Sequence, residues 1–133
     1  MISPVIHFSG NCLVAIGLYE KAFKVANKQV TLYKDAPDNH GMDITNDMFD
    51  LVMHSTITLC GTEFNMSDVM ENKTAGNMVC FNVFLDSEDE FLNAFEVLSN
   101  DGKVIQEVGP QFFSKLYTVI IDRFGIRWQM ILA

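Results

Sequence analysis

The same order of segments occurs twice in this chain, with a spacing of 76 residues. Near the N-terminus, Asn11 can cap a helix, because its side-chain oxygen can accept a free backbone N–H of the first turn. In the second half, Ser87 and Glu90 form a capping box. Apolar residues follow both caps at helical spacing: Ala15, Ile16, Tyr19, Ala22 and Phe23 after the first, and Phe91, Ala94, Phe95 and Leu98 after the second. We therefore expect helices near Asn11 to Phe23 and near Ser87 to Leu98.

Segments that are typical of strands surround each predicted helix. The expected strands are Pro4 to Ser9, Gln29 to Tyr33, Leu51 to Cys60 and Glu63 to Ser67 in the first half, and Met78 to Leu85, Lys103 to Val108, Leu116 to Ile121 and Ile126 to Leu132 in the second. This order predicts an α+β fold with two tandem β-α-β-β-β modules that form curved mixed sheets. An amphipathic helix covers only one face of such a sheet, so the other face must pack against something or line a cavity.

The chain has the length of one domain, since 133 residues with 49% hydrophobic content can bury a substantial core. We expect one domain over residues 1–133, with a first module at about 1–68 and a second at about 77–133. A polar hinge is expected within 69–77, and a long loop within 35–50.

The formal charge is 9 − 17 = −8, and no segment gathers enough lysine or arginine to bind a row of phosphates. Nucleic acid and anionic membranes are therefore poor partners, whereas the overall field would attract a cationic ligand. No apolar run is long enough to cross a membrane and no leader pattern is seen, so we expect a cytoplasmic protein. Cys12, Cys60 and Cys80 lack the close spacing of a zinc site, and each is expected to be a small buried residue.

Strand alternation sorts side chains into a set that faces the helix and a set that faces the other way. The second set contains five polar residues that we select as ligand-binding residues: His7, His54, Thr56, Asn82 and Gln129. A few placed polar groups within an apolar lining are typical of a small-molecule site. A solvent-exposed sheet face would show the same pattern, so that reading stays open.

Three stretches resemble the PhnB-like branch of the vicinal oxygen chelate superfamily: Phe8 to Cys12, Tyr19 to Phe23, and Tyr117 to Gln129 with its Asp-Arg-Phe-Gly turn at 122–125. This superfamily also contains glyoxalase I, extradiol dioxygenases and bleomycin-sequestering proteins. The resemblance covers nearly the whole chain and implies a homodimer, in which the ligand is held in a cavity between modules. For the turn itself we expect a structural role, in which Gly125 accepts a positive φ.

The resemblance also implies where a metal would be held, because metal-dependent members use His and Glu from the first and last strands of each module. The corresponding residues of this chain are Gln129, Cys80, Pro4 or Val5, and Asn65 or Met66. None of them is the expected ligand, so we predict no metal and no other cofactor. Members of this branch are often described as ubiquinone methyltransferases, but this sequence has no Gly-rich loop for a methyl donor.

Three functional hypotheses follow. The first is a small-molecule-binding protein without a catalytic metal. The second is a glyoxalase-type lyase or isomerase, or a dioxygenase, that acts on a small organic substrate. The third is a structural or regulatory dimer. The sequence does not decide whether a reaction is catalysed, because no residue pattern specifies one.

Overall fold

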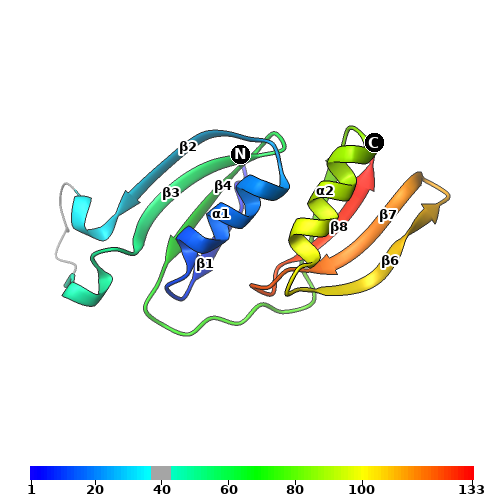
Figure 1. The fold of residues 1–133 in the computed structure, drawn as a ribbon. Coiled ribbons are helices and arrows are strands. Elements are labelled where there is room, and N and C mark those ends of the chain that lie inside the picture. The colour runs from blue at the N-terminus through cyan, green and yellow to red at the C-terminus, as the bar shows by residue number, and fades with distance from the viewer. Residues whose placement is uncertain (37–42) are drawn as a thin grey trace. The chain divides into compact units, whose positions relative to one another are not determined.

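A computed structural model describes residues 1–36 and 43–133 of the chain. The chain forms two compact units (Figure 1): Met1–Gly17 with Val25–Lys73, and Leu18–Lys24 with Thr74–Ala133. Each unit contains one open four-stranded sheet. Residues 37–42 of the loop predicted within 35–50, His40 among them, lie outside the described residues.

The first sheet has the strand order β1-β4-β3-β2. Its strands are β1 (Val5–Phe8), β2 (Val25–Leu32), β3 (Val52–Leu59) and β4 (Thr62–Asp68). β1 pairs with β4 in parallel, and the other pairs are antiparallel. Two short 3-10 helices, Tyr33–Asp35 and Asn46–Met48, lie between β2 and β3.

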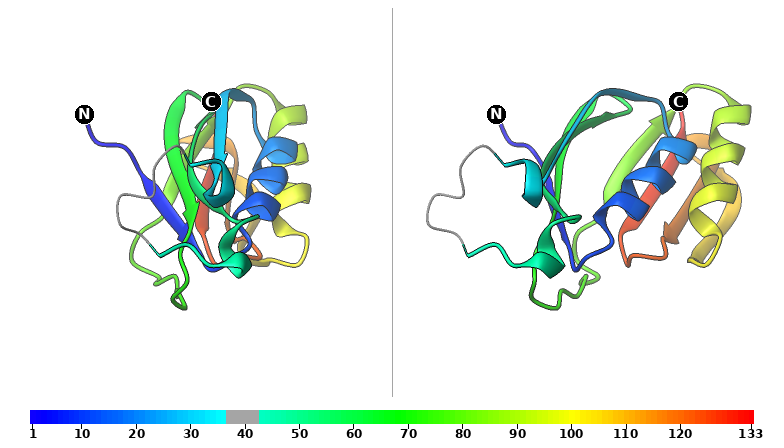
Figure 2. Two further views of the ribbon diagram at one scale, coloured as in Figure 1. Left: turned by 90° about the vertical axis from the view of Figure 1, so that its left-hand side faces the viewer. Right: turned by 60° about the vertical axis from the view of Figure 1, so that its left-hand side comes forward.

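The second sheet repeats this arrangement with the order β5-β8-β7-β6, and again its one parallel pair joins the first strand to the last. Its strands are β5 (Phe81–Leu85), β6 (Lys103–Gln111), β7 (Ser114–Ile121) and β8 (Arg127–Leu132). Helix α2 (Glu88–Ser99) packs across β5, β8 and β7 and lies along one face of this sheet (Figure 2). The predicted α+β class and the two β-α-β-β-β modules are confirmed, whereas the homodimer and the module limits remain predictions.

The strand that differs most from its prediction is β2, which begins at Val25 rather than at Gln29. Its first residues are mostly polar and exposed, so they carry no alternating pattern. The pairing with β3 also shifts between Ala26 and Gln29, next to Asn27 with its φ of +53°. A bulge of this kind interrupts the period of two on which strand prediction depends.

Helix α1 (Cys12–Ala22) begins with help from a distant residue. The Oδ1 atom of Asp68 accepts hydrogen bonds from the backbone N–H of Gly10 at 2.9 Å and of Cys12 at 3.0 Å. This carboxylate, and not the side chain of Asn11, therefore serves as the acceptor at the start of α1. At α2 one half of the predicted capping box is confirmed, since the Ser87 hydroxyl accepts from the Glu90 backbone N–H at 3.1 Å. The Glu90 carboxylate accepts from the backbone N–H of Asp86 at 3.2 Å, one residue before the position that the box predicts.

The core of the second unit is centred on Trp128 of β8, which is 2% exposed. The rings of Tyr19, Phe23 and Phe81 lie 5.5, 5.1 and 5.4 Å from it. Tyr19 lies in α1 and Phe23 directly follows it, so this end of α1 packs on the second sheet. The apolar stripe predicted for α1 is confirmed, because all five of its residues are buried: Ala15, Ile16, Tyr19, Ala22 and Phe23.

The turn between β7 and β8 has the structural role expected of it. Gly125 has a φ of +90°, which a residue with a side chain adopts only with strain. The Oδ1 atom of Asp122 accepts from the backbone N–H of Phe124 at 2.9 Å and of Ile126 at 3.1 Å. These bonds set where β8 begins. Within the described residues, no helix is both long and apolar enough to span a membrane.

Candidate functional site

The second sheet has one face covered by α2 and one opposite face, here called the open face. Side chains on the helix side are buried, among them Val83, Ile120, Trp128 and Met130. The alternate residues of each strand point to the open face, because side chains alternate along a strand. Strand register arranges these residues in rows that cross the sheet.

Two of the predicted ligand-binding residues lie side by side on this open face. Asn82 of β5 is the register partner of Gln129 of β8. The row continues from Gln129 to Val119 of β7, and from Val119 to Gln106 of β6. Neighbouring strands are about 4.8 Å apart, so the side-chain amides of Asn82 and Gln129 can act on one ligand group. We call the four residues Asn82, Gln129, Val119 and Gln106 the amide row.

An apolar row lies next to the amide row, further along β8. Its register partners are Phe84 with Ile131, Ile131 with Tyr117, and Tyr117 with Gly109. Phe84 is 59% exposed, although it is a large apolar side chain on a regular strand. The ring of Phe113 packs edge-on against Tyr117 with the centroids 5.1 Å apart. An apolar surface beside an amide pair is the composition expected of a small-molecule site.

The other three predicted ligand-binding residues belong to the first sheet. Thr56 of β3 lies in a row with Asn65 of β4 and Val5 of β1, because Asn65 is the register partner of both Thr56 and Val5. His7 is the partner of Ser67, and its Nδ1 lies 3.0 Å from the Ser67 Oγ. His54 is exposed and pairs with Thr31 on β2.

The two histidines are not neighbours, because strand β4 lies between β1 and β3. Two strand spacings correspond to about 10 Å between the Cα atoms of His7 and His54. Among the described residues, no group of three or more His, Cys, Asp or Glu includes these two histidines and could hold a metal ion.

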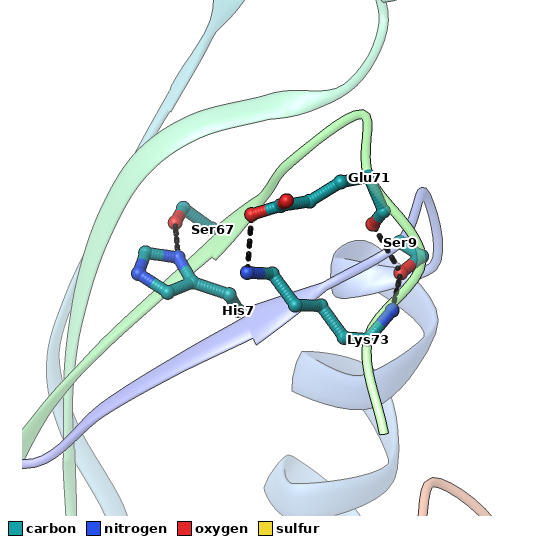
Figure 3. Close-up of polar contacts among 5 residues, drawn as sticks. All are labelled: His7, Ser9, Ser67, Glu71 and Lys73. Carbon is teal, nitrogen blue, oxygen red and sulfur yellow. Dashed lines mark hydrogen bonds and ion pairs between the residues drawn. The ribbon is translucent and has the colours of Figure 1, made fainter. Parts of the chain in front are cut away.

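A polar cluster follows His7 where the chain leaves β4 (Figure 3). The Ser9 hydroxyl donates to the Glu71 carbonyl at 3.0 Å and accepts from the Lys73 backbone N–H at 3.1 Å. The Lys73 ammonium pairs with the Glu71 carboxylate. This hydrogen bond and the charge of Lys73 hold the pKa of Glu71 below its usual value. Because these groups satisfy one another, we assign the cluster to holding the segment after β4 against β1.

The strand registers show how the positions at which the resemblance places metal ligands pair with one another. Val5 and Asn65 face one another in the first sheet. In the second sheet the partner of Gln129 is Asn82, whereas Cys80, which the sequence aligned with the ligand position, precedes the first residue of β5. None of these residues is a histidine or a carboxylate, and the described part of the chain has no cluster of three or more His, Cys, Asp or Glu suited to a metal ion. These residues do not fit the metal of the superfamily.

Within the described residues none of the three cysteines forms a disulfide, but their surroundings differ. Cys12 is fully buried, and burial together with the charge of Asp68 raises its pKa to about 12. A thiol with that pKa is unreactive at neutral pH, because the thiolate is the nucleophile. Cys80 is half-buried and Cys60 is exposed in the β3–β4 turn. The expectation that all three are buried is therefore wrong for Cys60, because a turn residue between two paired strands has no layer above it.

Sequence reasoning missed one buried acid, Asp68, which is 2% exposed. Besides the backbone N–H groups of Gly10 and Cys12, its carboxylate accepts from the backbone N–H of Val52 at 2.9 Å. A signal was present in the sequence, since Asp68 has the same parity along β4 as the buried Phe64 and Met66. The three hydrogen bonds of its carboxylate are all to backbone N–H groups, so Asp68 is structural and does not belong to the candidate site.

Comparisons with known proteins agree with this architecture. A family model described as 3-demethylubiquinone-9 3-methyltransferase matches residues 1–131. The protein YjdN of Escherichia coli (strain K12) is 25% identical over 140 residues, which cover 97% of this chain and 92% of YjdN.

Solved structures extend the comparison. The Bacillus cereus PhnB protein is 26% identical with a TM-score of 0.77, over 99% of this chain and 98% of that chain. The Pseudomonas aeruginosa protein PA1353 has a TM-score of 0.80 at 23% identity, over 99% and 96%. A glyoxalase/bleomycin resistance protein/dioxygenase family enzyme from Burkholderia phytofirmans PsJN shares the fold, with a TM-score of 0.61 at 10% identity over 95% and 92%.

Proposed function

This chain belongs to the PhnB-like family, whose model is described as 3-demethylubiquinone-9 3-methyltransferase, within the glyoxalase/bleomycin resistance/dioxygenase superfamily, and we propose that it binds a small organic molecule without a catalytic metal. The bound molecule lies against the open sheet face that carries the amide row. In this proposal the protein holds its ligand and does not transform it.

The adjacent amides of Asn82 and Gln129 are the observation that carries this proposal. A primary amide has two N–H donors and one oxygen acceptor, so a pair of amides can orient a ligand through hydrogen bonds. An amide oxygen is neutral, however, and does not compensate the charge of a divalent cation as glutamate does. The residues that replace the superfamily's ligands therefore suit an organic guest better than a metal.

We also propose that the methyl transfer in the family's description does not extend to this chain. The sequence has no Gly-rich loop between a strand and a helix that could hold a methyl donor. Titration of the protein with S-adenosylmethionine in a calorimeter is expected to show no binding. Binding with micromolar affinity would support the methyltransferase description.

A homodimer and a cytoplasmic location are further parts of the proposal. The cytoplasm is supported by three cysteines that form no disulfide within the described residues, since disulfides are rare in that compartment. The dimer is supported by the resemblance and is argued below from the open sheets.

The test of the proposed function combines metal analysis with fragment binding. Protein purified without added metal and then dialysed is expected to hold far less than one nickel, zinc, iron or manganese ion per chain. In a fragment screen followed by NMR, the side-chain NH₂ signals of Asn82 and Gln129 should shift with the bound fragments. Asn82→Ala and Gln129→Ala should weaken this binding, because each removes one orienting amide.

Gln111→Ala is the matched control, because Gln111 is an exposed amide at the end of β6. Near-stoichiometric metal would contradict the proposal and favour a glyoxalase-type lyase, isomerase or dioxygenase. Fragments that bind but never shift the Asn82 and Gln129 signals would place the ligand elsewhere. If no fragment binds, the structural or regulatory dimer becomes the better hypothesis.

A further inference from the structure

We propose that the ligand of the open face is an organic anion with an apolar, preferably aromatic, body, and that Arg127 and Lys103 bind its anionic group. This inference rests on the proposed function, because it names the chemical class of the molecule held at the same sheet. A third row of residues carries this inference. The amide row lies between this third row and the apolar row.

The third row, here called the cationic row, consists of Lys103, Ile121 and Arg127. Lys103 of β6 is the register partner of Ile121 of β7, and Ile121 is the partner of Arg127 of β8. The two cations thus lie on the same face with one strand between them, about 10 Å apart at their Cα atoms. Both side chains are long enough to reach a carboxylate or phosphate group placed above Ile121.

No hydrogen bond or ion pair joins the Arg127 guanidinium to another residue that the structure describes. Its Nε atom is buried and has no hydrogen-bond partner within the described part of the chain. A buried donor without an acceptor costs free energy, and a carboxylate or phosphate removes that cost if it reaches Nε itself. The Arg127 side chain as a whole is half-buried, so an anion can approach the guanidinium. Arginine suits this role because its planar fork can bind such groups through two parallel hydrogen bonds.

Among the described residues Lys103 and Arg127 have no acidic partner, which is unusual in a chain with more acidic than basic residues. Acidic residues outnumber basic ones by 17 to 9, and several lysines form ion pairs with them, such as Lys34 with Asp50 and Lys115 with Glu88. No ion pair joins Lys103 or Arg127 to another residue that the structure describes. None of the register positions in the cationic, amide and apolar rows is an aspartate or glutamate.

The three rows together describe the length and polarity of the ligand. Arg127, Gln129 and Ile131 are alternate residues of β8, so successive rows are about 6.6 Å apart. An anionic group at Arg127 therefore places a polar linker near the Asn82 and Gln129 amides. An apolar body then reaches Ile131, Phe84 and Tyr117, about 13 Å from the cationic row.

The net charge of −8 favours a cationic ligand at long range, in contrast to this local arrangement. Salt screens interactions between exposed charges beyond about 8–10 Å. The nearest charges therefore dominate once a ligand is in contact, because Coulomb energy falls with distance. Among the register positions of the three rows, the charged residues are Lys103 and Arg127.

A matched set of three benzamides tests the inference by NMR titration of the full-length protein. Hippurate carries a carboxylate, N-benzoylglycinamide is neutral, and N-(2-aminoethyl)benzamide is cationic. Each also has the aromatic ring and the amide linker that the other two rows would bind. We expect hippurate to bind at least tenfold more tightly than the other two probes, with shifts that map to the three rows.

Variants separate local binding from overall charge. Arg127→Gln should lower hippurate affinity by about tenfold, the size expected for a charge-assisted hydrogen bond, and should remove the preference for the anion. Lys103→Gln should cause a smaller loss in the same direction. Lys21→Gln is the control, because it removes one charge at an exposed position of α1 and should leave hippurate affinity unchanged. If Arg127→Gln does not fold, Lys103→Gln supplies the same test.

The inference is overturned by equal affinity for the three probes, by equal losses in Arg127→Gln and Lys21→Gln, or by shifts outside the three rows. Loss of self-association in Arg127→Gln with no change in hippurate binding would overturn it too, since the open face would then be a contact with a second copy. Failure of all three probes would likewise overturn it. In each case the fragment screen at Asn82 and Gln129 still decides the proposed function separately.

Discussion

Asp122 illustrates how much one residue holds together in this protein. It is 3% exposed, and its Oδ2 accepts from the Tyr19 hydroxyl at 2.7 Å and from the Trp128 Nε1 at 2.9 Å. Its Oδ1 accepts from the backbone N–H groups of the turn that precedes β8. One carboxylate therefore joins α1, the last turn and the aromatic core of the second unit.

Asp122→Ala leaves four donors without their acceptor, and we expect the free energy of unfolding to fall by about 3 kcal/mol. Urea denaturation measures the change. Asp86→Ala is the matched control, because Asp86 is exposed and its ion pair with the Lys24 ammonium, at 3.9 Å, is long. Its loss should lower the free energy of unfolding by less than about 1 kcal/mol. Equal effects of the two substitutions would show that Asp122 is not structurally important.

At the scale of the element, α1 contains a glycine that its surroundings do not require. Gly17 lies within the helix, and a Cβ built there would meet no atom within 4 Å. Glycine is a poor helix former because it loses more backbone entropy on folding than alanine does. Gly102, at the end of the connection from α2 to β6, differs because a Cβ there would lie 2.5 Å from the Ile121 carbonyl oxygen.

Gly17→Ala is therefore expected to raise the free energy of unfolding by about 0.5–1 kcal/mol. Gly102→Ala should lower it, since the added methyl group collides with backbone that cannot move freely. Thermal unfolding of both variants beside the parent protein gives the comparison. A destabilised Gly17→Ala variant would mean that α1 packs more closely at this position than the structure shows.

At the scale of the whole molecule, two open sheets leave unpaired edges and exposed apolar side chains. The edges are β1 and β2 in one sheet and β5 and β6 in the other. Phe112, between β6 and β7, is 99% exposed. Proteins seldom leave such edges and side chains in contact with water, because they invite association.

We therefore expect a homodimer, and light scattering should give twice the chain mass of 15.0 kDa, about 30 kDa, at micromolar concentration. A Phe112→Ser variant would show whether that side chain takes part, because it removes the most exposed aromatic ring of the described residues and leaves every residue of the three rows unchanged. A single species of 15.0 kDa throughout the concentration range would contradict the dimer.

The sequence alone determined the elements, because the signals for them are local. The capping box and apolar stripe predicted α2 at Ser87 to Leu98, and the helix covers Glu88–Ser99. Alternation likewise predicted that the side chain of Gln129 points away from Trp128 and Met130, which are buried. The order of these segments along the chain then predicted two β-α-β-β-β modules. Resemblance to a known family added the expected homodimer and the cavity between modules, which periodicity cannot give.

Only the tertiary structure decided which residues meet. The pairing of Gln129 with Asn82, rather than with Cys80, depends on the register between β5 and β8, and no local pattern encodes a register between strands so far apart in the chain. The same holds for Asp68, which replaces Asn11 as the acceptor at α1 from 56 residues away. For this reason the rows of the open face exist only in the folded protein. Each strand contributes one residue to a row, and pairing between the strands aligns these residues.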